Sequence, residues 1–284
     1  MTYRQLCELF ENAKIENAEW DAVCLMEHFL QVSPSLLRAT PDRDYASQEL
    51  EEAARRRLAH EPLQYILGEW EFYRQTYEVS PDCLIPRSDT EILVETAIRI
   101  LPIKAKFADL CTGSGCIAVS TLAERPDTTA AALEKFPATL ALAERNAKKN
   151  GVDARFCGVL EDVLTPPEKI AEHGPFDAIL SNPPYIPTKD IEALSPEVHA
   201  EPFAALDGGE DGLIFYRTIL KHYAPLLKED GFFLFEIGFD QAEALLALAK
   251  EQNFAHVCVK RDFGGNDRVV YISNIPFQER SQTL

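Results

Sequence analysis

The chain has 284 residues, of which 46% are hydrophobic and 26% charged, and its formal net charge is -18. This composition is typical of a globular protein with one sizeable core and room for a smaller domain. The acidic balance argues against a large nucleic-acid-binding face, because such faces bind phosphates through Lys and Arg. No apolar run approaches the ~20 residues of a membrane span, and the first residues lack the basic-then-apolar order of a signal peptide. We therefore expect a cytoplasmic protein that binds no membrane.

The seven cysteines are odd in number and form no Cys-x-x-Cys pair, and the six histidines show no ligand spacing. We therefore expect reduced, mostly buried thiols instead of disulfides. No metal site is expected either.

Residues 5–60 show helical periodicity, with apolar residues returning at the spacing of one helix face. Ser33 and Pro34 fit an N-cap followed by proline at the first helical position. Further helices are expected at about 46–59 and at 62–67, the second ending at Gly68. Arg55-Arg56-Arg57 is interpreted as a solvated face, with a partner contact as the alternative. Residues 1–69 are predicted to form a small helical substrate-recognition domain.

Between Trp70 and Val79 the apolar period changes to two, on either side of Arg74-Gln75, which predicts a β-hairpin. We interpret residues 70–84 as a hairpin linker between two domains. Ser88 and Glu91 then fit a capping box that opens a helix at 92–101. A helix cap at Ser88 does not account for the Pro86-Arg87 pair that precedes it.

From residue 106 onward, strands and helices alternate, which is the pattern of a doubly wound α/β sheet. Strands are expected at 107–110, 130–133, 154–157, 176–180, 232–236, 254–259 and 269–272. Helices are expected at 116–123, 138–149, 213–227 and 241–251. The last two strands are joined by a Gly-rich turn too short for a crossover, so they should be antiparallel. A Rossmann-like sheet with an antiparallel last strand is the order used by class I methyltransferases, and we assign residues 85–284 to it.

The segment Asp109-Leu110-Cys111-Thr112-Gly113-Ser114-Gly115 follows the first strand of this sheet and opens a helix. Glycines there permit a tight turn and a close approach to a nucleotide-like ligand, although such loops serve many cofactors and sometimes none. No Lys-Ser/Thr pair follows, which disfavours a phosphate-binding loop. Asp109 would repel a pyrophosphate and attract a cationic amino acid, which favours S-adenosylmethionine over NAD.

Acidic residues follow the next two strands. Glu134 ends the second strand, where a Rossmann-like fold places the acid that accepts the ribose hydroxyls. The alternative is an exposed carboxylate beside Lys135. After the third strand, Asp162 and Val163 would supply an acceptor for the adenine amino group and an apolar wall, unless Asp162 only caps a turn.

Asn182-Pro183-Pro184-Tyr185 follows the fourth strand of the sheet. Neither proline has an N–H, and each restricts the preceding residue to an extended conformation. The loop therefore cannot satisfy its own carbonyls. Acceptors at Asn182 and Pro183, with Tyr185 beside them, remain available to a flat group that carries an NH2. For a Pro-Pro pair alone, a simple turn is the commoner interpretation.

Three further segments accompany these motifs: Ile85-Pro86-Arg87-Ser88-Asp89-Thr90-Glu91, Glu201-Pro202 with the Gly-rich residues 205–213, and the segment 261–268. Together the motifs resemble those of the HemK-family release factor glutamine methyltransferases along essentially the whole chain. The resemblance implies methyl transfer from S-adenosylmethionine to the side-chain amide nitrogen, N5, of the glutamine in the Gly-Gly-Gln motif of class 1 peptide chain release factors. Cys111 stands where the family usually has its first glycine. Because Cys is small, we expect the loop to form with slightly different packing.

The resemblance also implies roles for individual residues. Asn182, Pro183 and Tyr185 would be catalytic, and residues 182–185, Pro184 included, would bind the glutamine. The implied cofactor contacts are Asp109, Cys111, Thr112, Gly113, Ser114, Gly115, Glu134, Asp162, Val163 and Asn182. We expect a monomer whose partner is a protein and not DNA.

Three other functions compete with this one. Glutamine methylation of a ribosomal protein would use the same site with a different docking domain. Adenine-N6 methylation of nucleic acid shares the Asn-Pro-Pro-Tyr motif but predicts a basic groove that this acidic chain does not show. A cofactor-binding module without activity would have no use for the free acceptors of the loop at 182–185.

Overall fold

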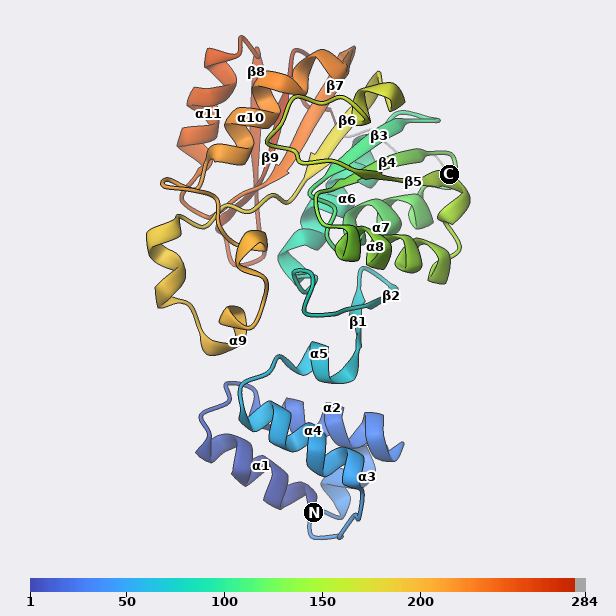
Figure 1. Ribbon diagram of the computed structural model, residues 1–284, viewed down its shortest axis with the longest axis vertical. Helices are drawn as coiled ribbons and strands as arrows, with labels where there is room; N and C mark the ends of the chain where they lie inside the picture. The colour runs from blue at the N-terminus through green and yellow to red at the C-terminus, as the bar shows by residue number, and fades with distance from the viewer. Residues whose placement is uncertain (279–284) are drawn as a thin grey trace. The chain divides into compact units, whose positions relative to one another are not determined.

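The computed structural model describes residues 1–278. The chain divides into two compact units, drawn in Figure 1: Met1–Glu69 together with Ser195–Ala200, and Trp70–Leu194 together with the segment from Glu201 onward. The first unit is helical and the second contains the sheet. We describe each by itself.

The first unit is built from short amphipathic helices around an apolar core. They are α1 (Tyr3–Asn12), α2 (Ala18–Leu30), α3 (Pro34–Ala39), α4 (Gln48–Leu58), α5 (Leu63–Leu67) and α9 (Pro196–His199). Ser33 caps α3 with Pro34 at the first helical position, as predicted. Gly68 ends α5 at a φ of 77°, a left-handed conformation that glycine adopts without strain. The core consists of side chains such as Leu6, Phe10, Leu25, Met26, Leu37 and Leu50.

Arg57 corrects the expectation of a solvated arginine face. Its side chain is buried, and its Nε donates to Asp21 Oδ2 at 2.7 Å. Its Nη1 lies 3.2 Å from Glu197 Oε1, an oxygen that also contacts His60 Nδ1 at 2.9 Å. A buried guanidinium requires such partners, because an uncompensated buried charge is strongly destabilising. Arg55, by contrast, is exposed as predicted.

The predicted hairpin consists of β1 (Glu69–Phe72) and β2 (Gln75–Glu78). Its turn lies at Tyr73 and Arg74, with φ angles of 41° and 67°, one residue earlier than the sequence indicated. Two-residue hairpin turns favour positive φ at both positions, because this matches the twist of the flanking strands.

The predicted capping box of Ser88 and Glu91 is wrong. Ser88–Thr90 forms a 3-10 turn, η1, and no side chain of the described residues caps it or the following helix α6 (Glu91–Ile100). Glu91 Oε1 instead accepts the N–H of Tyr73 at 3.0 Å. The carboxylate that would close the box therefore holds the hairpin turn.

Among the described residues, seven strands form one mixed sheet in the order β5-β4-β3-β6-β7-β9-β8. The strands are β3 (Lys106–Leu110), β4 (Thr129–Glu134), β5 (Phe156–Leu160), β6 (Phe176–Ser181), β7 (Leu227–Glu236), β8 (His256–Arg261) and β9 (Asp267–Ser273). The pairs from β5 to β7 are parallel, and β9 is antiparallel to both of its neighbours. The expected Rossmann-like sheet with its antiparallel strand is confirmed.

Helices cover both faces of the sheet (Figure 1). One face packs against α6, α7 (Cys116–Glu124) and α8 (Pro137–Lys149), and the other against α10 (Ile214–His222) and α11 (Ala242–Glu251). Short 3-10 turns lie at η2 (Asp153–Arg155), η3 (Ile170–His173), η4 (Thr188–Ala193), η5 (Phe203–Ala205) and η6 (Ala224–Leu226).

Some predicted boundaries are wrong by a few residues. The third strand of the sheet begins at Phe156, because η2 occupies the positions before it. Helix α10 ends at His222 and not near Leu227, since Pro225 cannot continue a helix. Strand β8 begins at His256, two residues later than predicted.

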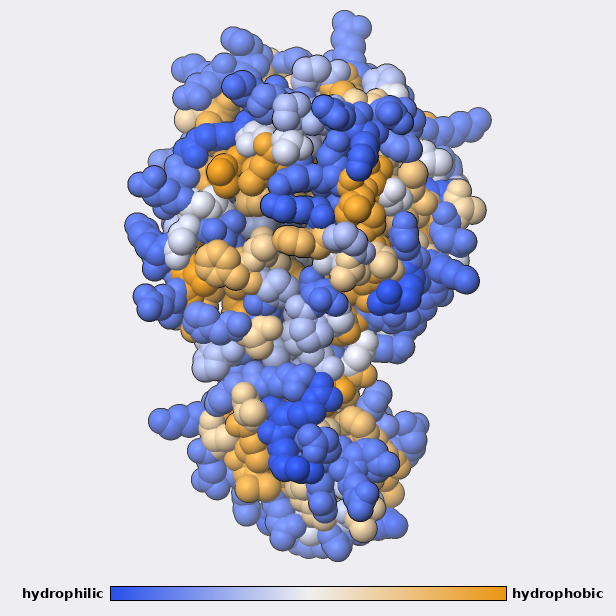
Figure 2. Space-filling model, in the orientation of Figure 1, coloured by the Kyte–Doolittle hydropathy of each residue, from blue (hydrophilic) through white to orange (hydrophobic). Residues whose placement is uncertain are grey.

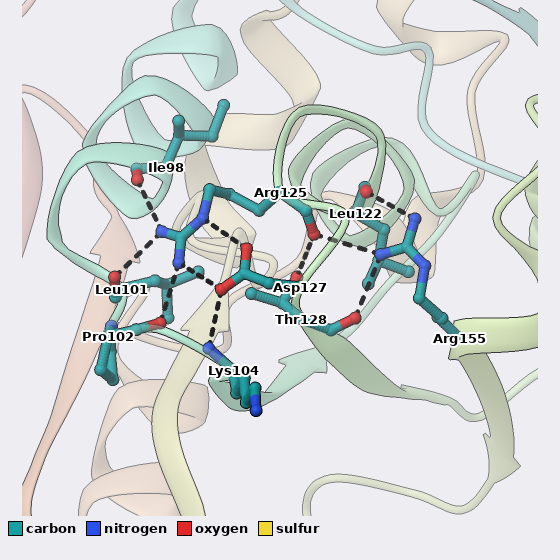
Figure 3. Close-up of polar contacts among 9 residues, drawn as sticks. All are labelled: Ile98, Leu101, Pro102, Lys104, Leu122, Arg125, Asp127, Thr128 and Arg155. Atoms are coloured by element: carbon teal, nitrogen blue, oxygen red, sulfur yellow. Dashed lines mark hydrogen bonds and ion pairs between the residues drawn. The ribbon is translucent and has the colours of Figure 1, made fainter. Parts of the chain in front are cut away.

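Two arginines fix the amino ends of β3 and β4 (Figure 3). The guanidinium of Arg125 donates to the carbonyl oxygens of residues 98, 101 and 102 at 2.9–3.0 Å. It also pairs with both oxygens of Asp127. Arg155 donates to the carbonyls of residues 122, 125 and 128. The bonds to residues 98 and 122 satisfy carbonyls in the last turns of α6 and α7, and the other four hold the chain that leads from these helices to β3 and β4.

Hydrophilic residues cover most of the face seen in Figure 2. Within residues 1–278, no helix has the length and apolarity needed to span a bilayer, and no three His, Cys, Asp or Glu side chains cluster as metal ligands would. Among the described residues the seven cysteines form no disulfide; Cys83 is buried, Cys157 is exposed and the other five are partly buried. The prediction of mostly buried thiols is therefore wrong, since small thiols also occupy partly covered positions here.

Candidate active site

A cavity of about 380 Å³ opens at the carboxyl ends of the parallel strands. This is the edge at which open α/β sheets bind ligands. The predicted site residues that line it are Cys111, Thr112, Gly113, Ser114, Glu134, Asp162, Val163, Asn182 and Pro184. Four predicted residues do not line it: Asp109, Gly115, Pro183 and Tyr185. Residues from four separate strand ends, those of β3, β4, β5 and β6, therefore meet in one cavity.

The loop after β3 depends on left-handed backbone at three positions. Cys111, Gly113 and Gly115 have φ angles of 60°, 56° and 82°. A side chain at Gly113 would meet nothing within 4 Å, so the backbone is open there. At Gly115 a Cβ atom would lie 3.2 Å from that of Ala143, so this glycine permits close packing on α8. Cys111 adopts the same conformation with a Cβ atom, which carries a steric cost that glycine does not have.

Asp109 stabilises the loop through hydrogen bonds. It is fully buried, and its Oδ2 accepts the Thr112 hydroxyl at 2.6 Å and the Ala118 N–H at 3.2 Å. Its Oδ1 has no hydrogen-bond partner among the described residues. Burial raises the pKa of Asp109 to about 7, although these two hydrogen bonds oppose the shift.

Glu134 connects the end of β4 to the loop. Its Oε2 accepts the N–H of Gly113 at 3.1 Å, and its Oε1 accepts those of Lys135 and Phe136 at 2.8 and 3.0 Å. The side chain is buried, and burial raises its pKa while the three N–H groups oppose the rise. The alternative of an exposed carboxylate is wrong. An ionised carboxylate has about four acceptor positions, so capacity for one more hydrogen bond remains.

Asp162 both caps a turn and pairs with a lysine. Its Oδ1 accepts the Leu164 N–H at 3.0 Å, and its Oδ2 lies 2.8 Å from Lys135 Nζ. Burial opposes ionisation, but these partners lower the pKa of Asp162 below its usual range. Val163 is buried in the cavity wall, and the exposed ring of Phe136 lines the cavity as a second apolar surface.

The Asn182-Pro183-Pro184-Tyr185 loop presents acceptors that the described residues leave unused. The carbonyl oxygens of Asn182 and Pro183 accept no hydrogen bond from the described part of the chain. Asn182 Nδ2 donates to Thr90 Oγ1 at 3.2 Å, so its Oδ1 is the free end of the amide. Tyr185 is anchored through its carbonyl oxygen, which accepts Gln241 Nε2 at 2.9 Å.

The Gly-rich segment at 205–213 holds this loop in place. A Cβ atom at Gly208 would lie 2.7 Å from Tyr185 Cα, and one at Gly212 would collide with the Tyr185 carbonyl oxygen. The main chain is paired as well, since Ile186 donates to Leu206 O at 3.0 Å and Gly208 donates to Ile186 O at 2.8 Å. These glycines are therefore required for close approach of the two segments.

Sequence reasoning missed several residues at the cavity. Arg87 lines it and pairs with Glu201, whose buried carboxylate also accepts the N–H of Ile85 at 3.0 Å. This pairing brings the segments around Pro86 and Pro202 together in space. Thr90 lines the cavity, and Glu236 is buried at the end of β7. The position of Glu236 at a strand end was the available signal.

Comparison with known proteins agrees with the geometry. The model of the PrmC N-terminal domain matches residues 2–68, and that of the methyltransferase small domain matches residues 88–210. A release factor glutamine methyltransferase of Geobacter sulfurreducens is 41% identical over 261 residues, 90% of this chain and 89% of the relative. The chain belongs to the release factor glutamine methyltransferase family. The expected resemblance is therefore confirmed.

Two further matches agree with this membership. The release factor glutamine methyltransferase of Salmonella typhimurium is 36% identical and covers 88% of this chain and 90% of its own length. Among solved structures, the catalytic domain of hMettl16 in complex with a MAT2A 3′UTR hairpin aligns with a TM-score of 0.58 at 15% identity, over 81% of this chain and 83% of that domain. The second likeness concerns the fold alone.

Proposed function

We propose that this chain transfers a methyl group from S-adenosylmethionine to the side-chain amide nitrogen of the glutamine in the Gly-Gly-Gln motif of class 1 release factors. The observation that carries the proposal is the set of unused acceptors at Asn182 and Pro183 beside a cavity lined by Glu134 and the Gly113 loop. Relatives in this family are named for glutamine methylation in release factors. The acceptors explain how a flat amide would be bound.

The cavity fits the cofactor by its chemistry. The open backbone at Gly113 permits close approach, Glu134 retains acceptor capacity for a ribose hydroxyl, and Val163 with Phe136 provides apolar surfaces for a base. Its volume of about 380 Å³ lies within the ~300–1,000 Å³ of small-molecule sites. When bound, S-adenosylmethionine supplies an electrophilic methyl carbon. Asp109 lies beneath the loop, where it holds Thr112 and the start of α7.

The chain's own contribution is to orient a poor nucleophile. An amide nitrogen shares its lone pair with the carbonyl, a delocalisation reflected in the ~18–20 kcal/mol rotation barrier of peptide amides. Asn182 Oδ1 and the Pro183 carbonyl would accept the two amide hydrogens and turn the nitrogen towards the methyl group. As positive charge develops on the nitrogen, these fixed dipoles stabilise the transition state more than the ground state. Tyr185 would pack beside the amide. The methylated nitrogen then loses a proton readily, so no strong base is required.

The wider setting is part of the proposal. Residues 1–69 would recognise the release factor, and residues 70–84 would link this domain to the methyltransferase domain. We place the reaction in the cytoplasm, where release factors act, with the chain as a monomer.

Methyl transfer to defined acceptors tests the proposed function. The chain and radiolabelled S-adenosylmethionine would be incubated with a class 1 release factor, with the same factor carrying alanine for the Gly-Gly-Gln glutamine, with ribosomal proteins and with DNA. We expect label in the intact release factor alone. Equal labelling of the alanine form would exclude the glutamine as acceptor, and labelling of ribosomal protein or DNA instead would replace the proposed substrate.

A further inference from the structure

Asn182 and Glu236 lie side by side at the carboxyl ends of neighbouring strands. Parallel pairing of β6 with β7 aligns Ser181 with Phe235, so the next residue on each strand is Asn182 and Glu236. Leu180 and Leu234 belong to the core cluster that packs on α6. Because side chains alternate along a strand, residues two positions further on face the same side. Both side chains therefore point towards the start of α6, where Thr90 lies.

Thr90 contacts both of these residues. Its Oγ1 lies 3.2 Å from Asn182 Nδ2, and its hydroxyl is near enough to the Glu236 carboxylate to lower the pKa of that group, against the rise that burial causes. Thr90 and Glu236 are 2% and 1% exposed, so water does not compete freely for these bonds. One oxygen of that carboxylate, Oε2, has no hydrogen-bond partner among the described residues. A buried carboxylate is expensive to retain without a role, and the mechanism above gives it none.

The direction of these hydrogen bonds follows from proton count. A threonine hydroxyl has one proton and two acceptor lone pairs, and an ionised carboxylate can only accept. When Glu236 is ionised, Thr90 must therefore donate its proton to the carboxylate. Thr90 Oγ1 can then only accept a hydrogen bond from Asn182, and the Asn182 side chain can donate one only through its NH2 group. Its Oδ1 is thereby directed away from Thr90.

We infer that Thr90 and Glu236 are positioning residues that fix the amide of Asn182 with its oxygen towards the cavity. This inference rests on the proposed function, because only an acceptor at this position serves an incoming NH2 group. Without the hydroxyl, the Asn182 amide could flip and present its NH2 group to the substrate NH2, which cannot bind it.

These hydrogen bonds make the orientation of the Asn182 side-chain amide depend on the charge of Glu236. A protonated Glu236 can donate to Thr90 Oγ1, and the Thr90 proton is then free to bind Asn182 Oδ1 in the flipped amide. Burial raises the pKa of Glu236 to about 7, so the productive orientation should be gained as pH rises through neutrality. The groups that face Glu236 from the surrounding elements are Arg268, Arg87, Asp89, Tyr185, Tyr216 and Cys116.

Three variants of the full chain test the inference: Thr90→Val, which removes the hydroxyl at nearly constant shape, Thr90→Ser, which keeps it, and Glu236→Gln, which accepts the Thr90 proton but does not titrate. We expect Thr90→Val to lower kcat about 10-fold, as is usual for residues that orient a catalytic group. The Kd for S-adenosylhomocysteine and the unfolding midpoint should stay near the parent values. Thr90→Ser should restore kcat, and Glu236→Gln should abolish the rise in kcat around pH 7.

Two results would overturn the inference: a Thr90→Val variant with parental kcat, or a Glu236→Gln variant with the parental pH profile. If Thr90→Val unfolds, Glu236→Gln and Thr90→Ser still decide through their pH profiles, because a hydroxyl with a titrating carboxylate should keep the inflection and an amide should not. Failure of the proposed function is distinguishable, because the parent chain itself would then leave the class 1 release factor unlabelled. If Asn182→Ala loses activity and Thr90→Val keeps parental activity, the inference about Thr90 is contradicted but the proposed function is not.

Discussion

The polar groups at the two ends of the parallel strands are satisfied to different degrees. At the amino ends, Arg125 and Arg155 donate to carbonyl oxygens, and Arg125 also pairs with Asp127 (Figure 3). At the carboxyl ends, one oxygen of Asp109 and one of Glu236 are buried without a hydrogen-bond partner in residues 1–278. Buried polar groups that lack partners are costly and tend to persist where function requires them. We call the amino ends, held by Arg125 and Arg155, the scaffold end of the sheet, and the carboxyl ends, with Asp109 and Glu236, the working end.

The pKa values of the carboxyl groups at the two ends of the sheet also differ. The Arg125 guanidinium lowers the pKa of Asp127 to about 2, whereas burial raises the pKa of Asp109 and Glu236 to about 7. Asp127 therefore contributes stability that is present above its ordinary pKa and lost as pH falls through about 2. Asp109 and Glu236 favour the folded state most below their ordinary pKa and lose that contribution as pH rises to about 7.

Removing the scaffold contacts should have the largest effect on stability. Arg125→Met leaves the carbonyls of residues 98, 101 and 102 without their donor, and we expect a loss of about 3 kcal/mol in the free energy of unfolding. Urea denaturation measures it. The control Arg74→Met removes a side chain that is 75% exposed and should change stability by less than ~0.5 kcal/mol. Equal effects of the two variants would contradict the special role of the scaffold end.

A change at the working end should instead affect catalysis. Gly212→Ala places a methyl group against the Tyr185 carbonyl oxygen, and we expect kcat to fall about 100-fold through displacement of the acceptor loop. Gly151→Ala is a matched control, because Gly151 has a φ of 69°, against 74° for Gly212, but nothing within 4 Å of the added methyl group. Both variants share the backbone strain, so comparable kcat values would show that the contact with Tyr185 is unimportant.

The pH dependence of stability sharpens the comparison. Glu236→Gln should be more stable than the parent by on the order of 2 kcal/mol at pH 8 and no more stable at pH 4, because ionisation of the buried carboxyl is removed. Asp127→Asn should show the opposite sign, with a loss at pH 7 that disappears towards pH 2. Urea midpoints from pH 2 to pH 8 check both. A loss of stability at pH 8 in Glu236→Gln would mean that ionised Glu236 has unseen partners.

The smallest effect concerns the strained loop position. Cys111→Gly should increase the free energy of unfolding by about 1 kcal/mol, because glycine adopts the φ of 60° without a Cβ penalty. Affinity for S-adenosylhomocysteine, measured by calorimetry, should not decrease. A destabilised variant would show that the packing of the thiol outweighs the relief of strain.

Local chemistry explains which parts of the molecule could be predicted from the sequence. The parallel strands, the antiparallel β9 and the acceptor loop at 182–185 follow from hydrophobic period, turn length and proline stereochemistry, which act over a few residues. Most of the residues predicted at successive strand ends meet in one cavity, because the carboxyl ends of parallel strands lie at the same edge of the sheet; Asp109, Gly115, Pro183 and Tyr185 do not line it. The functional roles assigned to them remain proposals.

Contacts between distant segments could not be predicted in this way. The pairs Arg57–Asp21 and Arg87–Glu201 join residues separated by 36 and 114 positions. Arg57, Asp21 and Glu201 are buried, and a charged side chain gives no local sign that it will be buried. The capping-box prediction failed because Glu91 found a partner in the hairpin turn. Thr90 and Glu236 are brought to Asn182 by strand order and register, which depend on the whole sheet.

Asn182→Ala tests the central claim most directly, because it removes the acceptor without touching the Gly-rich loop or Glu134. The measurements are kcat for methyl transfer to an intact class 1 release factor and the Kd for S-adenosylhomocysteine by calorimetry. We expect kcat to fall by about 100- to 1,000-fold, the usual cost of removing one preorganised polar group from an active site, while the Kd changes less than about twofold. A near-normal kcat would contradict the account, and so would a loss of activity explained entirely by lost cofactor binding.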